Sequence, residues 1–240
     1  MVIIAKNAEG TIGKTLESLY GFKEVVLYLN DSSDNTEKIA GRYSNVKVAK
    51  GEFVGFGPTK NLAASYASNE WILSLDSDEI LTGENIEEIS RLDLGQRDRL
   101  YRMYRDNYFL GHKTQSSDKI VRIYHKGFTR FNDNSVHEKI IIPKGATVID
   151  LKSHFIHLNI TDINQTLTKI IHYTDLGSEG KKICFFGTVL ARSLFAFCKT
   201  YIFQGNIIRG WVGFALAVNS ANKRYYKYLK QYINCQKEKA

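Results

Sequence analysis

Three features of the sequence predict an α/β fold, in which a mostly parallel sheet continues into a mixed half and is followed by helices. Over the first 82 residues, short apolar runs alternate with helical patterns, which is typical of parallel strands joined by crossover helices. From about residue 98, strand-like runs follow one another directly, which indicates mixed or antiparallel pairing. Beyond Asp162 the pattern is helical to the end. We therefore expect one domain over residues 1–160, with halves at 1–97 and 98–160, and a helical segment over 161–240.

Four short apolar runs predict the buried strands of the parallel half, and they are Val2–Ala5, Val25–Leu29, Val46–Ala49 and Trp71–Leu75. Apolar residues at helical spacing predict an amphipathic helix after the first strand, and they are Ile12, Leu16, Leu19 and Tyr20. Polar clusters follow three of the strands, at residues 5–9, 30–34 and 76–79. Because ligands bind beyond the carboxyl ends of parallel strands, we expect these clusters to converge on one crevice.

Two further helices are predicted in the parallel half from their first turns. Asp34 and Glu37 have the spacing of a capping box, which predicts a helix that ends near Tyr43. Another helix is predicted through Lys60–Ala67. Pro58 lies near its first turn, where proline is tolerated. In the mixed half, strands are predicted at Leu100–Phe109, Lys119–His125 and Phe128–Phe131, with a loop at Val136–Glu138.

The cluster Asp76–Glu79 ends an apolar strand and is the strongest chemical signal in the sequence. Its two aspartates, at i and i+2, can hold a divalent cation such as Mg²⁺ or Mn²⁺, which prefers carboxylate and phosphate oxygens. The alternative is an acidic helix start, since a short helix is predicted near Gly83. The position after a buried strand favours the metal. His154 and His157 have the spacing of a ligand pair, although histidines near apolar strands are more often structural.

The basic residues are concentrated in the last quarter of the chain. The net charge is +8, from 33 basic and 25 acidic residues, but residues 181–240 hold 11 basic residues and one acid. This asymmetry predicts a polyanionic partner, either a membrane surface or a nucleic acid. No apolar run reaches the roughly 20 residues that span a bilayer. Aromatic residues interspersed with Arg192, Lys199 and Arg209 indicate helices that lie in the membrane interface. The near absence of acidic residues favours this over a helical pair packed on the core.

The three cysteines, Cys184, Cys198 and Cys235, form no CxxC pair, and we expect them to be unpaired in a reducing cytosol. The first strand begins directly after Met1 and is shorter than the apolar core of a signal peptide. Both features predict a cytoplasmic protein.

Seven segments of the chain carry a resemblance to a known family. Four of them are Ile4–Glu9, Asn30–Thr36, Lys60–Ala63 and Trp71–Glu79, and they occur in the order found in family 2 glycosyltransferases of the GT-A fold. Three more are Arg122–Tyr124, Val136–Glu138 and Phe203–Gly210, and they resemble the bacterial lipopolysaccharide core β-1,4-glucosyltransferase group. The resemblance covers essentially the whole chain. It implies a Rossmann-like GT-A domain followed by a basic, membrane-associating helical segment.

By position, the resemblance implies that the first two loops hold the nucleotide through Ala5, Asn7, Glu9, Asn30, Asp31 and Asp34. The family's first aspartate of the second loop falls at Leu29, so either Asn30 or Asp31 takes its place. Lys60 would face the diphosphate or the donor sugar.

The resemblance also implies the reacting groups. Asp76 and Asp78 would form the DxD motif, with Asp78 as the more direct metal ligand. Glu138 falls at the position of the catalytic base, beside His137, and His157 falls at a late metal or phosphate contact.

The implied reaction is an inverting single displacement that transfers glucose from UDP-glucose to the inner core of a lipopolysaccharide or lipooligosaccharide, assisted by Mg²⁺ or Mn²⁺. The implied partners are the UDP-sugar, the lipid-linked acceptor and the anionic cytoplasmic face of the inner membrane. Two alternatives stay open: a family 2 enzyme that uses another UDP-sugar for a different surface glycan, and a basic nucleic-acid-binding protein without catalysis. The sequence leaves the linkage and the oligomeric state open.

Overall fold

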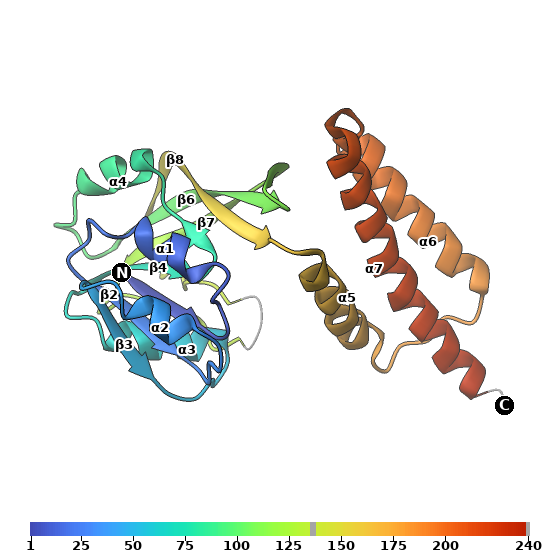
Figure 1. The fold of residues 1–240 in the computed structure, drawn as a ribbon, viewed down its shortest axis with the longest axis horizontal. Helices are drawn as coiled ribbons and strands as arrows, with labels where there is room; N and C mark the ends of the chain where they lie inside the picture. The colour runs from blue at the N-terminus through green and yellow to red at the C-terminus, as the bar shows by residue number, and fades with distance from the viewer. Residues whose placement is uncertain (135–137, 239–240) are drawn as a thin grey trace. The chain divides into compact units, whose positions relative to one another are not determined.

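The computed structural model describes residues 1–134 and 138–238 and contains two compact units. The sheet unit consists of residues 1–107 and 116–159, and the helical unit consists of residues 108–115 together with the chain from Ile160 onward. Figure 1 shows the first as a sheet flanked by helices and the second as a group of long helices. The division falls close to residue 160, and a short hairpin tip from the middle of the chain belongs to the helical unit.

The sheet unit begins with the predicted alternation of strands and helices. The strands β1 (Val2–Ala5), β2 (Val25–Leu29), β3 (Val46–Lys50) and β4 (Trp71–Asp76) pair in parallel in the order β3-β2-β1-β4. They are joined by α1 (Ile12–Glu17), α2 (Thr36–Ala40) and α3 (Phe56–Ser65). The expectation of a mostly parallel first half is confirmed.

The sheet continues beyond β4 with antiparallel pairs. β4 pairs with β7 (His112–His125), which is followed across the sheet by β6 (Arg99–Phe109), β8 (Thr147–Ile160) and the two-residue β5 (Glu79–Ile80). The helix α4 (Gly83–Ser90) begins where a short helix was expected, and the side chains of Thr82 and Asn85 form its capping box. The sheet is therefore mixed, as predicted, with β4 at the boundary between its two halves.

The structure corrects three local predictions. Phe128–Phe131 is no strand, because only Phe131 forms a bridge, to Ile140. The long strand β8 lies in a stretch for which no strand was predicted. Asp34 and Glu37 form no capping box, because the Asp34 carboxylate accepts hydrogen bonds from Thr36, two residues on, and the helix begins only there.

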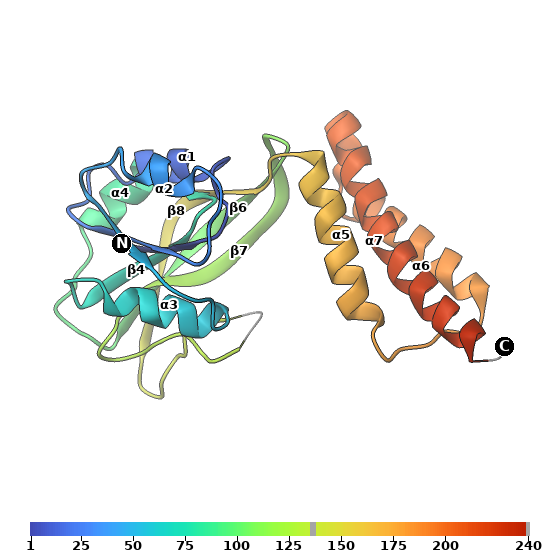
Figure 2. The same cartoon turned by 60° about the horizontal axis from the view of Figure 1, so that its bottom comes forward.

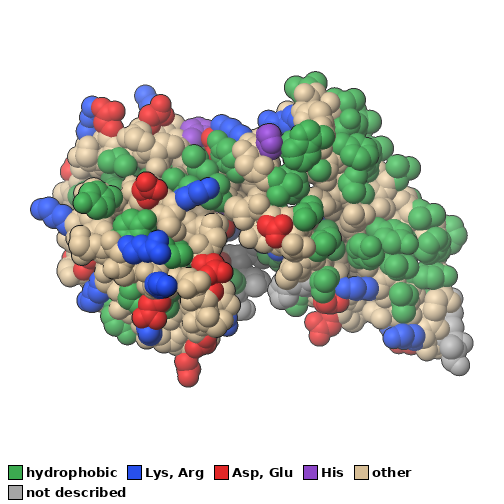
Figure 3. Space-filling view, viewed as in Figure 1, with side chains coloured by type: hydrophobic (Ala, Val, Ile, Leu, Met, Phe, Trp, Pro, Cys, Tyr) green, Lys and Arg blue, Asp and Glu red, His purple; other side chains and the backbone are tan. Residues whose placement is uncertain are grey.

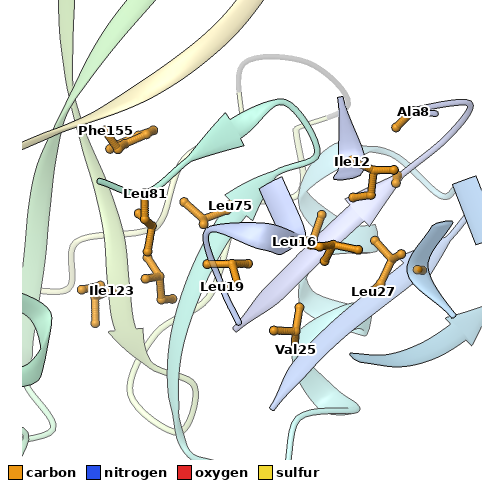
Figure 4. Close-up of a cluster of buried hydrophobic side chains, with 14 of the residues drawn as sticks. Ala8, Ile12, Leu16, Leu19, Val25, Leu27, Leu75, Leu81, Ile123 and Phe155 are labelled. Atoms are coloured by element: carbon orange, nitrogen blue, oxygen red, sulfur yellow. The ribbon is translucent and has the colours of Figure 1, made fainter. Parts of the chain in front are cut away.

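The core lies on both faces of the parallel half, as expected for strands covered by helices on each side. Ile3 and Ala5 of β1 face one cluster, which includes Ile12 and Leu16 of α1 and is shown in part in Figure 4. Val2 and Ile4 face the other, which includes Ala63 and Ala64 of α3. Figure 2 shows α1 and α2 on one side of the sheet and α3 on the other. Tyr20, predicted on the apolar face of the first helix, lies beyond its end and is 73% exposed.

The helical unit consists of α5 (Ile163–Ser178), α6 (Phe186–Cys198) and α7 (Gly210–Lys237), and α7 packs against both others. A π-helical turn (Lys199–Phe203) and a 3₁₀ turn (Asn206–Arg209) join α6 to α7. No helix in the described part of the chain is both long and apolar enough to cross a bilayer.

Cys184 and Cys235 form a disulfide, so the expectation of three unpaired cysteines is wrong for these two, and Cys198 is free. The segment before α6 runs beside the end of α7, where the Ile183 amide donates to the Gln231 carbonyl oxygen. This pairing brings the two Cα atoms to 5.5 Å despite a sequence separation of 51 residues.

Candidate active site

The strand register places the predicted polar clusters at one edge of the sheet. Ala5 of β1 lies opposite Leu29 of β2, and Ile4 lies opposite Asp76 of β4. The loops that follow these three strands therefore leave the sheet at neighbouring points of its carboxyl edge, where ligands of such sheets bind. Thr15 of α1 donates a hydrogen bond to the Ser77 carbonyl oxygen at 3.0 Å, which holds the helix against the third loop.

Reciprocal hydrogen bonds join the first two loops. The Ser33 amide donates to Asn7 Oδ1 at 2.8 Å, and the Glu9 amide donates to Asp34 Oδ2 at 2.9 Å. In return, Glu9 Oε2 accepts from the amide of Asn35 at 3.0 Å. Burial alone would raise the pKa of Asp34, but the hydrogen bonds from Thr36 and from the Glu9 amide hold it below its usual value. Asn7, Glu9 and Asp34 thus shape the loops themselves.

Two of the residues predicted to hold the nucleotide have left-handed backbones. Asn7 has φ 50° and Asp31 has φ 54°, a conformation that asparagine and aspartate tolerate better than other side chains. Asn30 is buried, and its amide donates to the Ala5 carbonyl oxygen at 3.1 Å, whereas Asp31 is exposed. Of the two residues expected to replace the missing aspartate, Asp31 is therefore the one whose side chain is accessible to a ligand.

Asp76, the first residue of the DxD motif, is held between two cations. Its Oδ1 lies 2.7 Å from Lys60 Nζ, and its Oδ2 lies 2.8 Å from Arg122 Nη2. Burial alone would raise the pKa of the Asp76 carboxyl, but the Lys60 ammonium and the Arg122 guanidinium hold it well below its usual range. Both oxygens of Asp76 are engaged by the protein, which leaves this residue poorly suited to bind a metal directly.

Glu138, the predicted base, lies next to the same lysine. Lys60 Nζ is 2.8 Å from Glu138 Oε1, and the lysine side chain is only 3% exposed. Burial alone would lower the pKa of Lys60, but the Asp76 carboxylate raises it above its usual value, so the ammonium stays charged. The structure thus brings Glu138 and the DxD motif together through Lys60. Val136 and His137, which precede Glu138 in the predicted motif, lie outside the described residues.

The close packing of α3 fixes the position of Lys60 relative to the chain before Glu138. A Cβ atom on Gly57 would lie 1.8 Å from the Asn132 carbonyl oxygen, so only glycine fits there. Asn61 adds two hydrogen bonds to the backbone of Phe131, at 2.9 and 3.0 Å. The first turns of α3 therefore hold the segment that leads to Glu138.

A buried ion-pair network behind the DxD motif was not predicted from the sequence. The Glu79 side chain is fully buried and contacts Arg122 Nη2 and, at 3.2 Å, Arg105 Nη1. Burial raises the pKa of Glu79 despite the neighbouring Arg122 guanidinium. Glu79 Oε2 also accepts a hydrogen bond from the Asp76 amide at 2.9 Å. These contacts fix the turn that carries both aspartates of the motif.

Asp78 and His157 meet because β5 pairs with β8. Glu79 lies opposite His157 in this pair, and His157 Nε2 is 3.4 Å from Asp78 Oδ2. The other ring nitrogen of His157 is 2.7 Å from Asn107 Oδ1. Asn107 Nδ2 donates to Asp118 Oδ2 at 3.0 Å, which orients the amide so that its oxygen accepts from His157 Nδ1. His157 Nε2 is then the ring nitrogen that faces the Asp78 carboxylate.

This arrangement fits a divalent cation better at Asp78 and His157 than at Asp76. A carboxylate oxygen and an imidazole nitrogen that face each other at 3.4 Å are stabilised by a cation or a proton between them. Within residues 1–134 and 138–238, no group of three or more acidic, histidine or cysteine residues is placed to hold a metal alone. One or two protein carboxylates completed by phosphate oxygens are the usual set for Mg²⁺ in a nucleotide site, and Asp78 would supply such a carboxylate.

His154 takes no part in this site. It stacks on Tyr104 with ring centroids 4.7 Å apart, and its Nδ1 is 3.0 Å from Asp106 Oδ1. Residues three apart on a strand point to opposite faces, so His154 and His157 of β8 do not form a ligand pair. The structural role considered for His154 is the one observed.

A parallel half-sheet with an acidic motif at its carboxyl edge, continued by an antiparallel half, defines the GT-A class of α/β glycosyltransferase folds. The chain belongs to glycosyl transferase family 2, whose family model matches residues 1–143. It is 25% identical over 248 residues to an uncharacterized glycosyltransferase of Rickettsia typhi, covering 95% of this chain and 84% of the relative. It is 24% identical to the lipopolysaccharide core biosynthesis glycosyltransferase LpsC of Rhizobium meliloti, covering 91% and 86%.

Among solved structures, the chain is similar to S. aureus TarS in complex with UDP. The TM-score is 0.48 at 15% sequence identity, over 98% of this chain and 90% of that chain. The complex of TarS with UDP-GlcNAc gives a TM-score of 0.46 over 64% of this chain and 56% of that chain.

Proposed function

We propose that this glycosyltransferase moves a sugar, glucose from UDP-glucose, to the inner core of a lipid-linked lipopolysaccharide or lipooligosaccharide with inversion at the anomeric carbon. The observation that carries the proposal is the position of Lys60, whose ammonium contacts both Asp76 of the DxD motif and Glu138. This puts a fixed positive charge beside the proposed base and next to the motif at which the diphosphate is proposed to bind. The relative LpsC, named for lipopolysaccharide core biosynthesis, supports the choice of acceptor.

The proposed reaction needs a base for the acceptor hydroxyl and a positive charge near the departing diphosphate. The acceptor hydroxyl oxygen forms a bond to the anomeric carbon, its proton passes to Glu138, and the bond between that carbon and the diphosphate oxygen breaks. Lys60 stabilises the negative charge that develops on the departing diphosphate. A Mg²⁺ or Mn²⁺ ion held by Asp78 and His157 would act there as a Lewis acid. Asp31 and the two joined loops bind the nucleoside.

The proposed partner of the helical unit is the anionic cytoplasmic face of the inner membrane, where the lipid-linked acceptor is made. Residues 181–240 carry 11 basic residues and one acid, and a basic residue near such a surface contributes about 1 kcal/mol. The enzyme is accordingly proposed to be cytoplasmic and peripheral to the membrane.

UDP release from a panel of UDP-sugars tests the donor and the metal together. We expect turnover of one donor with Mn²⁺ or Mg²⁺ and loss of turnover with EDTA or in the Asp78→Asn variant. The exposed Asp162 at the start of α5 provides a matched control, and Asp162→Asn should leave turnover unchanged. Turnover of a donor other than UDP-glucose would reassign the sugar. A chain that binds no UDP-sugar in calorimetry would overturn the proposal.

A further inference from the structure

The turn between α6 and α7 exposes an unusual amount of apolar surface. Six large side chains within 13 residues are each 52–84% exposed. We call them the turn surface, and they are Ile202, Phe203, Ile207, Ile208, Trp211 and Phe214. Figure 3 shows hydrophobic side chains gathered over the helices of this unit. Contiguous exposed apolar side chains mark a surface that binds a partner, because exposing them to water is unfavourable.

Hydrogen bonds and close packing within the turn fix its backbone, and its apolar side chains face outward. Asn206 is buried, and its side chain donates to the Thr200 carbonyl oxygen at 2.8 Å. A Cβ atom on Gly213 would lie 1.8 Å from the Asn206 carbonyl oxygen, so α7 packs directly on the turn. Gly205, with φ 65°, supplies the left-handed residue that the turn needs. In an ordinary loop the polar groups face solvent and the apolar ones are buried, whereas here the two are exchanged.

The tip of the β6–β7 hairpin, which belongs to the same unit, supports the turn. Arg209 donates to the Lys113 carbonyl oxygen, and Gln115 Nε2 lies 3.5 Å from the Gly205 carbonyl oxygen. The His112 ring packs edge-on against Trp211 with centroids 5.5 Å apart. These contacts leave the outer side of the turn surface uncovered.

The charge around the turn surface selects its partner. No acidic residue occurs between Glu179 and Glu238, and Lys199 and Arg209 flank the turn. A second copy of the chain would bring two such basic segments together, which like-charge repulsion opposes. An anionic lipid surface complements this charge and accepts the apolar side chains below its headgroups, the environment in which tryptophan is enriched.

We propose that the turn surface inserts into the headgroup region of an anionic bilayer and holds the enzyme beside its acceptor. The inference deepens the proposed function, because it rests on the acceptor being lipid-linked. The helices lie on the bilayer without crossing it, which agrees with the finding that no described helix is suited to span one. Insertion adds apolar burial to the attraction between charges, so salt that screens the basic residues should weaken binding without abolishing it.

Vesicle binding by the full chain tests the proposal. We expect strong binding to vesicles that contain phosphatidylglycerol and weak binding to pure phosphatidylcholine. The double substitution Phe203→Ser and Ile208→Ser should weaken binding at least about a hundredfold, because two large side chains no longer enter the bilayer. The matched control, Tyr20→Ser with Leu94→Ser, removes two exposed apolar side chains from the sheet unit and should change nothing.

Trp211 reports insertion directly. We expect brominated lipids to quench its fluorescence, with the quenched component absent from the Trp211→Phe variant. Equal binding by the double variant and its control would overturn the inference, as would a double variant that turns a dimer into a monomer without losing vesicle binding. UDP-sugar turnover separates the two proposals. Turnover without vesicle binding defeats the inference and the proposed membrane partner but leaves the transfer reaction standing, and vesicle binding without UDP-sugar binding defeats only the transfer reaction.

Discussion

The two units distribute charge and apolar surface in opposite ways. The sheet unit buries Lys60, Glu79, Asp106 and Arg122, whereas no lysine, arginine, aspartate or glutamate of the described helical unit is buried. Of the 28 large hydrophobic side chains that are exposed in the described chain, 18 lie in the helical unit, although it is the smaller of the two.

The difference shows what each unit is built to contact. Burying charges is costly unless each is paired, and such pairs hold reacting groups at fixed positions. Exposed apolar side chains are costly in water and are compensated only by a partner surface. The buried, paired charges of the sheet unit suit the proposed reaction centre, and the exposed apolar side chains of the helical unit suit the proposed membrane contact.

Among the substitutions that test the contrast between the units, we expect the largest effect from removing the carboxylate beside Lys60. Glu138→Gln is expected to lower the rate of sugar transfer by about 10²–10⁴-fold, because the acceptor proton loses its acceptor. Steady-state UDP release with acceptor measures this effect. Glu17→Gln, on the exposed side of α1, is the control and should transfer sugar at the normal rate. A Glu138→Gln variant of normal activity would remove Glu138 from the chemistry.

Arg122 tests whether buried charge is specific to the sheet unit. Arg122→Met removes the guanidinium that Glu79 and Asp76 share and leaves them only Arg105 and Lys60, and we expect a loss of about 3–5 kcal/mol in the free energy of unfolding. Arg192→Met, on the exposed face of α6, should cost about 0.5 kcal/mol or less. Urea unfolding of both variants measures the difference, and equal costs would contradict the contrast between the units.

Asn107 tests whether the sheet unit holds a metal ligand in a fixed orientation, because its side chain accepts the hydrogen bond that orients His157. Asn107→Ala removes the acceptor for His157 Nδ1, and we expect Mn²⁺ affinity in the presence of UDP to fall about 10–100-fold. Electron paramagnetic resonance of free Mn²⁺ measures the affinity. UDP binding without metal should not change, and neither should the metal affinity of Asn164→Ala on α5. An unaltered affinity in Asn107→Ala would exclude His157 as an oriented ligand.

The smallest effect is expected on α6, where a buried and an exposed residue are adjacent. Val189 is fully buried and Leu190 is 51% exposed. Val189→Ala should destabilise the protein by about 1.5–3 kcal/mol, whereas Leu190→Ala should change stability by about 0.5 kcal/mol or less. Thermal unfolding of the two variants without lipid measures both. A large cost for Leu190→Ala would show that this face belongs to a folded core.

The sequence predicts the parallel half well because strands buried on both faces are continuous apolar runs, such as Val25–Leu29. It predicts β8 poorly because this strand carries Ser153, His154 and His157 among its apolar residues and so lacks such a run. The capping box failed because Asp34 has a nearer partner in Thr36. A continuous apolar run can be read from the sequence, whereas competition between hydrogen-bond partners cannot.

The candidate site likewise contains residues that the sequence reveals and residues whose role depends on contacts made only in the folded chain. Asp76 and Asp78 can be found because they follow a buried strand, but their partners Lys60, Arg122 and His157 come from α3, β7 and β8, which meet only in the folded sheet unit. Asp118 and Arg122 share one face of β7, and this alternation of charges within a strand is a signal that sequence reasoning could have used. The Cys184–Cys235 pair had no such signal, because it depends on the packing of α7 beside the segment before α6.

The double contact of Lys60 also implies an order of substrate addition. Its single ammonium group serves Asp76 and Glu138 at once, and an incoming diphosphate competes for the same protons. In the proposed mechanism, Glu138 is therefore released to accept a proton only after the donor has bound, and an acceptor that arrives first meets a carboxylate already engaged in an ion pair. We expect compulsory-order kinetics with the nucleotide sugar first, in which UDP inhibits competitively against the donor and noncompetitively against the acceptor.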